Sequence, residues 1–182
     1  MQNWSGDPGQ QYFADGLTDE RTADLARLGK LHVIAPASTM PYQDTHKPLP
    51  QIARELNVDA VVTGTVEREG KRVRVRTALV RASTDEVLWA QSYDRDLGDA
   101  LGLEGEVSQA IAREVGVKLT PETQQRLERK PTTSPEARDA YLRARYFFDK
   151  DDAEGATKCL QYLQEMGMSL TQVSPICSMR RW

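Results

Sequence analysis

The sequence predicts an α/β fold, a two-layer sandwich of a mixed sheet of about four strands with two or three helices, followed by an α-helical hairpin. Three observations predict it. Helical and strand periodicities alternate along residues 1–120, and two tight turns join three strands between residues 58 and 96. A polar segment with several prolines then precedes two further helices.

The first helix is marked at both ends. Asp7 is a suitable N-cap, and Pro8 fits the first helical position, where its missing N–H costs nothing. Phe13 and Leu17 follow on one helical face, and Gly29 is a typical helix end. These signals predict a helix that buries one face.

The next segments are shorter. The apolar, β-branched run Leu31–Ala35 predicts a buried strand. Residues 36–50 contain four prolines and predict a loop, with a short turn after Ser38. Pro50 is expected to begin a second helix, which ends near residue 57.

Three strands are predicted at residues 58–69, 72–80 and 87–96. Because only tight turns separate them, they are expected to form an antiparallel meander. The middle strand alternates strictly between an apolar face and a basic face. The apolar face carries Val73, Val75, Thr77 and Leu79, and the basic face carries Arg72, Arg74 and Arg76.

A long helix is predicted over residues 102–118, with apolar residues at an i+4 spacing from Leu103 to Leu119. The sequence then divides into parts. The expected domains are an α/β domain at 1–120, a linker at 121–134, a helical hairpin at 135–166 and an irregular tail at 167–182.

Catalytic signatures are missing from the sequence: there is no GxSxG elbow, P-loop, GxGxxG or HExxH motif. His32 is expected to be an ordinary strand residue, and His46 a solvated loop residue. Asp94 and Asp96 close a strand, where charged residues usually blunt an edge. We therefore expect no catalytic residue, no metal site and no cofactor, and we expect that the chain is not an enzyme.

One group of side chains is a candidate interaction surface. Arginines on one strand with aromatic residues two strands along resemble a nucleic-acid platform. The alternative, which we favour, is a solvated sheet face that Glu67 and Glu69 neutralise. The residues of this surface are Arg72, Arg74, Arg76, Trp89 and Tyr93.

The composition argues against several classes of binding partner. The formal net charge of the 182 residues is -3, which gives no electrostatic reason to expect nucleic acid or membrane insertion. No apolar run is long enough to cross a bilayer, and residues 1–16 have neither the basic region nor the apolar region of a signal peptide. Cys159 and Cys177 have no metal-ligand spacing. The chain as expressed is therefore expected to be cytoplasmic.

Several segments together resemble a known family. YFADGLT, RELNVDAVVTGTV and LWAQSYDRDL, within about residues 4 to 120, resemble the TolB-like amino-terminal domain family, which is related to the flagellar FlgO-type domain. PEARDAYLRARYFFD and GATKCLQYLQ resemble the first helix pair of a tetratricopeptide array. The family occurs in bacterial proteins with a winged-helix, adenylate cyclase or kinase output domain. This resemblance implies a sensing or protein-interaction role and an extracytoplasmic, membrane-anchored parent.

The chain departs from the family pattern in three places. The family's opening apolar strand is missing, so we expect Met1 to be an internal methionine of a longer parent. Arg21 stands where a leucine or isoleucine would continue the apolar face of the first helix, and we expect it at a tolerant edge. The sequence after Gln164 lacks the repeat period, as a frameshift would produce.

We therefore expect a non-catalytic ligand- or protein-binding module of an envelope-associated signalling protein. The alternative is a structural scaffold that docks a tetratricopeptide array, or a fragment of a parent whose output domain lies elsewhere. A protein partner is expected, a small-molecule ligand is compatible with this role, and two copies could pair through an open sheet edge.

Overall fold

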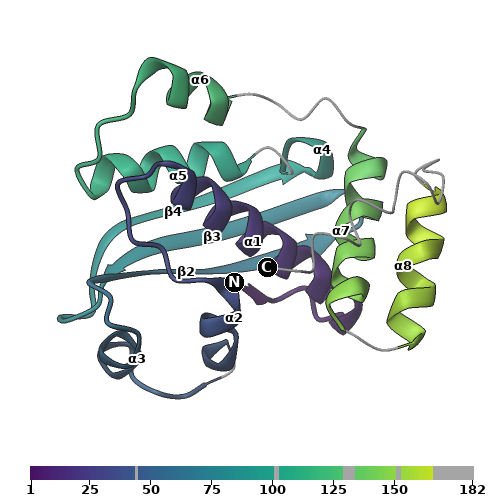
Figure 1. Cartoon of the computed structure of the whole chain (residues 1–182), viewed down its shortest axis with the longest axis horizontal. Coiled ribbons are helices and arrows are strands. Elements are labelled where there is room, and N and C mark those ends of the chain that lie inside the picture. The colour runs from purple at the N-terminus through teal and green to yellow at the C-terminus, as the bar shows by residue number, and fades with distance from the viewer. Residues whose placement is uncertain (44, 101–102, 129–133, 151–152, 166–182) are drawn as a thin grey trace. The chain divides into compact units, whose positions relative to one another are not determined.

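A computed structural model describes residues 1–43, 45–100, 103–128, 134–150 and 153–165 of the chain (Figure 1). The chain divides into two compact units, Met1–Pro131 and Thr132–Trp182. The predicted fold class is confirmed, because helices cover a mixed four-stranded sheet and a helical part follows it. The predicted tail at 167–182, which includes Cys177, lies outside the described residues.

The sheet has the order β1-β2-β3-β4. Its strands are β1 (Gln2–Asn3), β2 (Ala60–Glu69), β3 (Arg72–Arg81) and β4 (Glu86–Asp96). Strand β1 runs parallel to β2, whereas β2, β3 and β4 are antiparallel neighbours. The predicted meander is thus confirmed, and the parallel β1 makes the sheet mixed.

The predicted strand at Leu31–Ala35 is wrong. The segment forms no ladder, and the described sheet contains the unpredicted β1 instead, which pairs with Thr65 and Val66. An apolar, β-branched sequence favours a strand only where a neighbouring backbone supplies hydrogen bonds. Local sequence could not show that Leu31–Ala35 has no such neighbour.

The first helix begins and ends close to the predicted positions. A 3-10 turn, η1 (Pro8–Gln10), leads into α1 (Gln11–Arg27). The Asp7 carboxylate accepts a hydrogen bond from the Gly9 N–H at 2.8 Å, as an N-cap should. Gly29 follows the helix with a φ of 66°, a left-handed conformation that glycine adopts without steric cost.

The core of the first unit lies between one face of the sheet and two helices, α1 and α5 (Leu103–Glu114), as Figure 1 shows. A one-turn helix, α4 (Leu97–Ala100), connects β4 to this region. The most deeply buried side chains come from both the sheet and the two helices. They include Phe13, Leu17, Val66, Val73, Val75 and Val107.

Helix α5 is shorter than predicted. It ends at Glu114, and Gly116 adopts a φ of 72°, so the helix stops one turn before the end of the apolar pattern. Val115, which was predicted to continue the buried face, is 36% exposed. The apolar side chain at this end of the helix therefore remains open to solvent.

Arg21 is not at an edge, which corrects the expectation from sequence. Arg21 is only 5% exposed, and its Nη1 lies 2.8 Å from the sulfur of Met1. The Met1 amine donates a hydrogen bond to Thr18 Oγ1 at 2.9 Å, and burial lowers its pKa. Two basic groups, the Arg21 guanidinium and the Met1 amine, thus lie close together at α1.

The proline-rich segment contains α2 (Pro36–Thr39) and the 3-10 turn η2 (Met40–Tyr42), and α3 (Leu49–Leu56) follows it. A polar cluster ties the segment to α3. The Lys47 ammonium and the Tyr42 hydroxyl each donate to the Glu55 carboxylate at 2.8 Å, and Gln51 donates to it at 3.0 Å. These bonds lower the pKa of Glu55 from 4.5 to about 2, with Lys47 contributing most.

This cluster gives a prediction for pH dependence. A carboxyl group whose pKa is depressed in the folded state stabilises it above its ordinary pKa, and the contribution is lost as the pH falls through the folded value. We expect the Lys47 amide resonance to move toward a disordered position between pH 4.5 and about 2. In the Glu55→Gln variant, the Lys47 amide resonance should already lie at its low-pH position at neutral pH. A wild-type resonance that did not move over this pH interval would contradict the prediction.

The predicted linker at 121–134 is partly helical. Helix α6 (Pro121–Glu128) occupies its first half, and Leu127 is only 7% exposed. The polar sequence did not predict this helix, whose buried apolar side chain is that of Leu127. The backbone of α6 also approaches α5 closely at Gly105, which has no side chain to separate the two helices.

The second unit contains the two predicted helices, α7 (Pro135–Asp149) and α8 (Ala153–Glu165). The Ser134 hydroxyl accepts a hydrogen bond from the Ala137 N–H at 3.1 Å and caps α7. Ala144, Cys159 and Leu163 form a small core, against which aromatic residues pack. Among the helices that the structure describes, none combines the length and apolar character needed to span a membrane.

Candidate interaction surface

The alternation of β3 separates two faces of the sheet. Val73 and Val75 are almost completely buried and face the helices. Arg72, Arg74 and Arg76 point to the opposite face and are exposed. The predicted alternation is therefore present, and it positions three guanidinium groups in a row on the face opposite α1 and α5.

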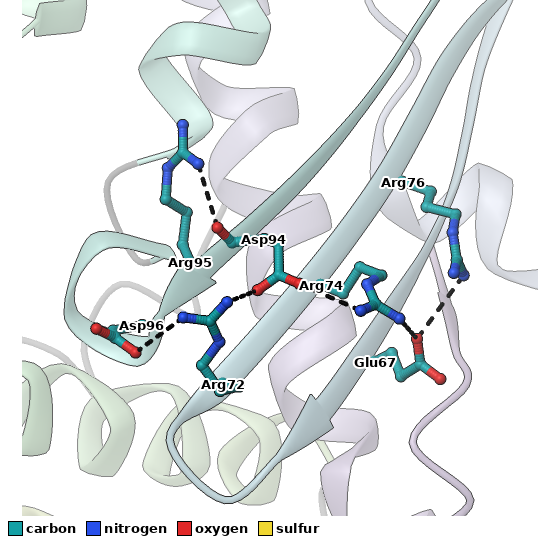
Figure 2. Close-up of polar contacts among 7 residues, drawn as sticks. All are labelled: Glu67, Arg72, Arg74, Arg76, Asp94, Arg95 and Asp96. Carbon is teal, nitrogen blue, oxygen red and sulfur yellow. Dashed lines mark hydrogen bonds and ion pairs between the residues drawn. The ribbon is translucent and has the colours of Figure 1, made fainter.

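Carboxylates from both neighbouring strands lie between these arginines (Figure 2). On β4, Asp94 pairs with Arg72 and, at 3.2 Å, with Arg74. On β2, Glu67 lies 3.4 Å from Arg74 and 3.8 Å from Arg76. Asp96 completes the set, 3.7 Å from Arg72. We call these six residues, Glu67, Arg72, Arg74, Arg76, Asp94 and Asp96, the arginine ladder.

The arginine ladder is electrically balanced, because its three guanidinium groups face three carboxylates. Hydrogen bonding from Arg74 and the nearby charge of Arg72 lower the pKa of Asp94, so its carboxylate stays charged in mildly acidic solution. All these side chains are substantially exposed, so the pairs contribute little to stability. Their main effect is to neutralise a row of cations that would otherwise attract polyanions.

Trp89 and Tyr93 do not join the arginines. In the register of the sheet, Tyr93 pairs with Val75 and Trp89 pairs with Leu79, so both aromatic residues lie on the helix-facing side. Tyr93 is 4% exposed, and burial followed by the charge of Glu106 raises the pKa of its hydroxyl. The surface predicted from sequence is thus split between two faces: the arginines are exposed on one, and on the other Tyr93 is buried and Trp89 is half-buried.

The carboxylates of the arginine ladder allow a direct test of this neutralisation. Replacing Asp94 with asparagine removes the group that holds Arg72 and Arg74. The variant should elute from a heparin column at a higher salt concentration than the wild type. Asp24→Asn is the matched control, because it removes the same charge from a carboxylate that pairs with the exposed Arg27 on α1. Equal elution of the two variants would contradict the prediction.

The other side chains considered from sequence lie apart. His32 and His46 are both exposed, and His32 belongs to the segment that forms no strand. The described residues contain no group of three or more histidine, cysteine or acidic side chains arranged to hold a metal ion.

Comparison with known proteins relates the chain to a much longer protein. It is 38% identical over 143 residues to a Rhizobium meliloti (strain 1021) protein described as "Putative adenylate cyclase 3". The match covers 79% of this chain and 24% of that protein, so the chain spans about a quarter of its relative's length. No protein-family model matches the chain.

Two solved structures are similar in part. The lipoprotein GNA1162 from Neisseria meningitidis matches with a TM-score of 0.45 and 21% identity, over 65% of this chain and 94% of that one. A PelC dodecamer from Paraburkholderia phytofirmans matches with a TM-score of 0.36 and 24% identity, over 53% of this chain and 66% of that one.

Proposed function

We propose that the chain is a non-catalytic ligand- or protein-binding module of a signalling protein. The observation that carries this proposal is the 38% identity over 143 residues to the Rhizobium meliloti protein. The matched region is only 24% of that protein's length, so a cyclase catalytic domain would lie in the other three quarters. The region shared with this chain would then regulate the output, as its resemblance to TolB-like domains implies.

The second unit supports the protein-binding side of the proposal. We infer that α7 and α8 begin a tetratricopeptide array, whose repeats bury their apolar faces against one another. Phe147 stacks on Tyr162 with ring centroids 5.8 Å apart, as expected for a hairpin held by aromatic packing. Leu160 is 39% exposed on α8, where a following helix pair could cover it.

The proposal includes two further expectations. The parent protein is expected to be associated with the cell envelope, as the family resemblance implies.

Two copies could pair through β4, which is the terminal strand of the sheet and is eleven residues long. Sedimentation of the chain against a Gln91→Pro variant would test this, because proline cannot donate a backbone hydrogen bond within a strand.

The proposed function is tested by two assays on the same folded sample. Incubation with ATP should yield no cyclic AMP, because the chain is proposed to be a regulatory part. A panel of metabolites and envelope proteins should contain at least one binder that raises the melting temperature, since binding only to the folded state stabilises it. Formation of cyclic AMP would overturn the non-catalytic assignment. A well-folded sample that bound nothing in the panel would contradict the binding role.

A further inference from the structure

A groove of about 460 Å³ lies where several elements of the first unit end. Its walls come from α3, the start of β2, the end of β3 with the turn that follows it, one residue of β4 and the residue after α5. The apolar part of the lining includes Ala53, Val58, Ala82, Leu88 and Val115. This volume lies within the range of small-molecule sites, which is roughly 300–1,000 Å³.

Two irregularities bring apolar side chains to this groove. The register of β3 and β4 pairs Leu79 with Trp89 but Val80 with Val87, so Leu88 is an extra residue in a β-bulge. A bulge redirects a side chain, and Leu88 lines the groove. The early end of α5 leaves Val115 36% exposed on the same lining. Both features place apolar surface where solvent reaches it.

The groove also carries one cation and one anion without an ion-pair partner among the described residues. The Arg54 Nε donates to the Pro50 carbonyl at 3.2 Å, and its two terminal nitrogens have no carboxylate within reach in the described part of the chain. Asp59 accepts a hydrogen bond from the Ala82 N–H through its backbone carbonyl at 2.9 Å, and its carboxylate is exposed. By contrast, the neighbouring Arg81 pairs with Glu86 at 2.8 Å.

These charges belong to adjoining elements. Arg54 lies in the last turn of α3, and Asp59 directly precedes β2. Asn57 lies between them and turns the chain with a φ of 52°, a left-handed conformation that asparagine tolerates better than most residues. The turn therefore holds a guanidinium and a carboxylate on one lining without joining them in an ion pair.

We propose that this groove binds a short apolar peptide of dipeptide size with both termini free. The Arg54 guanidinium would bind the peptide carboxylate, for which its planar fork is suited. The Asp59 carboxylate would bind the peptide ammonium, and the apolar peptide side chains would contact Leu88 and Val115. This inference rests on the proposed binding function and names the ligand class of that function.

Calorimetric titration of the full chain tests the proposal with three probes. Leucyl-leucine carries both charges, N-acetyl-leucyl-leucine lacks the ammonium, and leucyl-leucinamide lacks the carboxylate. We expect leucyl-leucine to bind about fivefold more tightly than either analogue, because each exposed charged contact contributes about 1 kcal/mol. Arg54→Gln should abolish the preference over the amide, and Asp59→Asn should abolish the preference over the acetylated peptide.

The variants Arg76→Gln and Asp96→Asn are matched controls, because they make the same changes in the arginine ladder, away from the groove lining. Both should keep the wild-type preferences. If leucyl-leucine binds but Arg54→Gln and Asp59→Asn retain both preferences, the inference is overturned and a binding role still stands. If no dipeptide binds at a concentration of about 10 mM, any affinity is weaker than that of an ordinary ligand, and the inference is overturned as well. The ligand panel described above remains an independent test of the proposed function.

Discussion

Replacing Gly105 with alanine is expected to lower the free energy of unfolding by about 1–3 kcal/mol, the usual cost of overpacking. A Cβ atom at this position of α5 would lie 1.9 Å from the Leu127 carbonyl oxygen and 2.9 Å from its carbonyl carbon. Both atoms belong to the backbone of α6, so no side-chain rotation can relieve the contact. Alanine has a helix propensity about 1 kcal/mol more favourable than that of glycine. A decrease in the free energy of unfolding would therefore show that the contact with α6 outweighs this gain.

Urea unfolding followed by circular dichroism measures this effect, with Glu114→Ala as the control on an exposed position of the same helix. The control should change the free energy of unfolding by no more than about 0.5 kcal/mol. Limited proteolysis should also cleave the Gly105→Ala variant faster within α6, since the helix must move away. A variant as stable as the wild type would show that α6 does not pack closely on Gly105.

Replacing Phe13 with alanine is expected to cost about 3–5 kcal/mol, which is the typical range for a buried phenylalanine. Phe13 has an exposure of 0% and lies between α1 and the sheet. Its ring lies 5.5 Å from the Arg68 guanidinium carbon, and Arg68 in turn donates to the Tyr12 hydroxyl at 2.7 Å. Truncation would therefore leave a cavity and also remove the aromatic face that the cation contacts.

The control for this variant is Trp4→Ala, which removes a larger aromatic side chain that is 59% exposed. Thermal unfolding should show a large decrease in melting temperature for Phe13→Ala and a small change for Trp4→Ala. Equal effects of the two substitutions would contradict the assignment of Phe13 to the core.

Several elements could be predicted because their signals are local. Asp7 and Pro8 mark the start of the first helix, and Gly29 marks its end, where the structure has a capped start and a positive φ. The strict alternation of β3 predicted which of its residues face the core. Leu31–Ala35 was predicted wrongly, because a strand requires a partner that local sequence does not identify.

The two surfaces differ in how far they could be predicted. The arginines of the ladder were evident from the alternation of β3, and Glu67 was expected to neutralise them, but the position of Tyr93 depends on which residue of β4 pairs with Val75. A slip of one residue would move every β4 side chain to the other face. The groove gave no sequence signal, since its residues come from four separate segments.

Periodicity and end signals in the sequence therefore determined most helices, the meander and the two faces of β3, because each depends on the conformation of a few neighbouring residues. Only the tertiary structure decided the strand register, the burial of Arg21 and the close approach of α6 to Gly105. It also decided which charges found partners: Arg74 pairs across strands, whereas Arg54 does not pair within the described residues. These features depend on distances between segments far apart in the chain, which packing of the whole core sets.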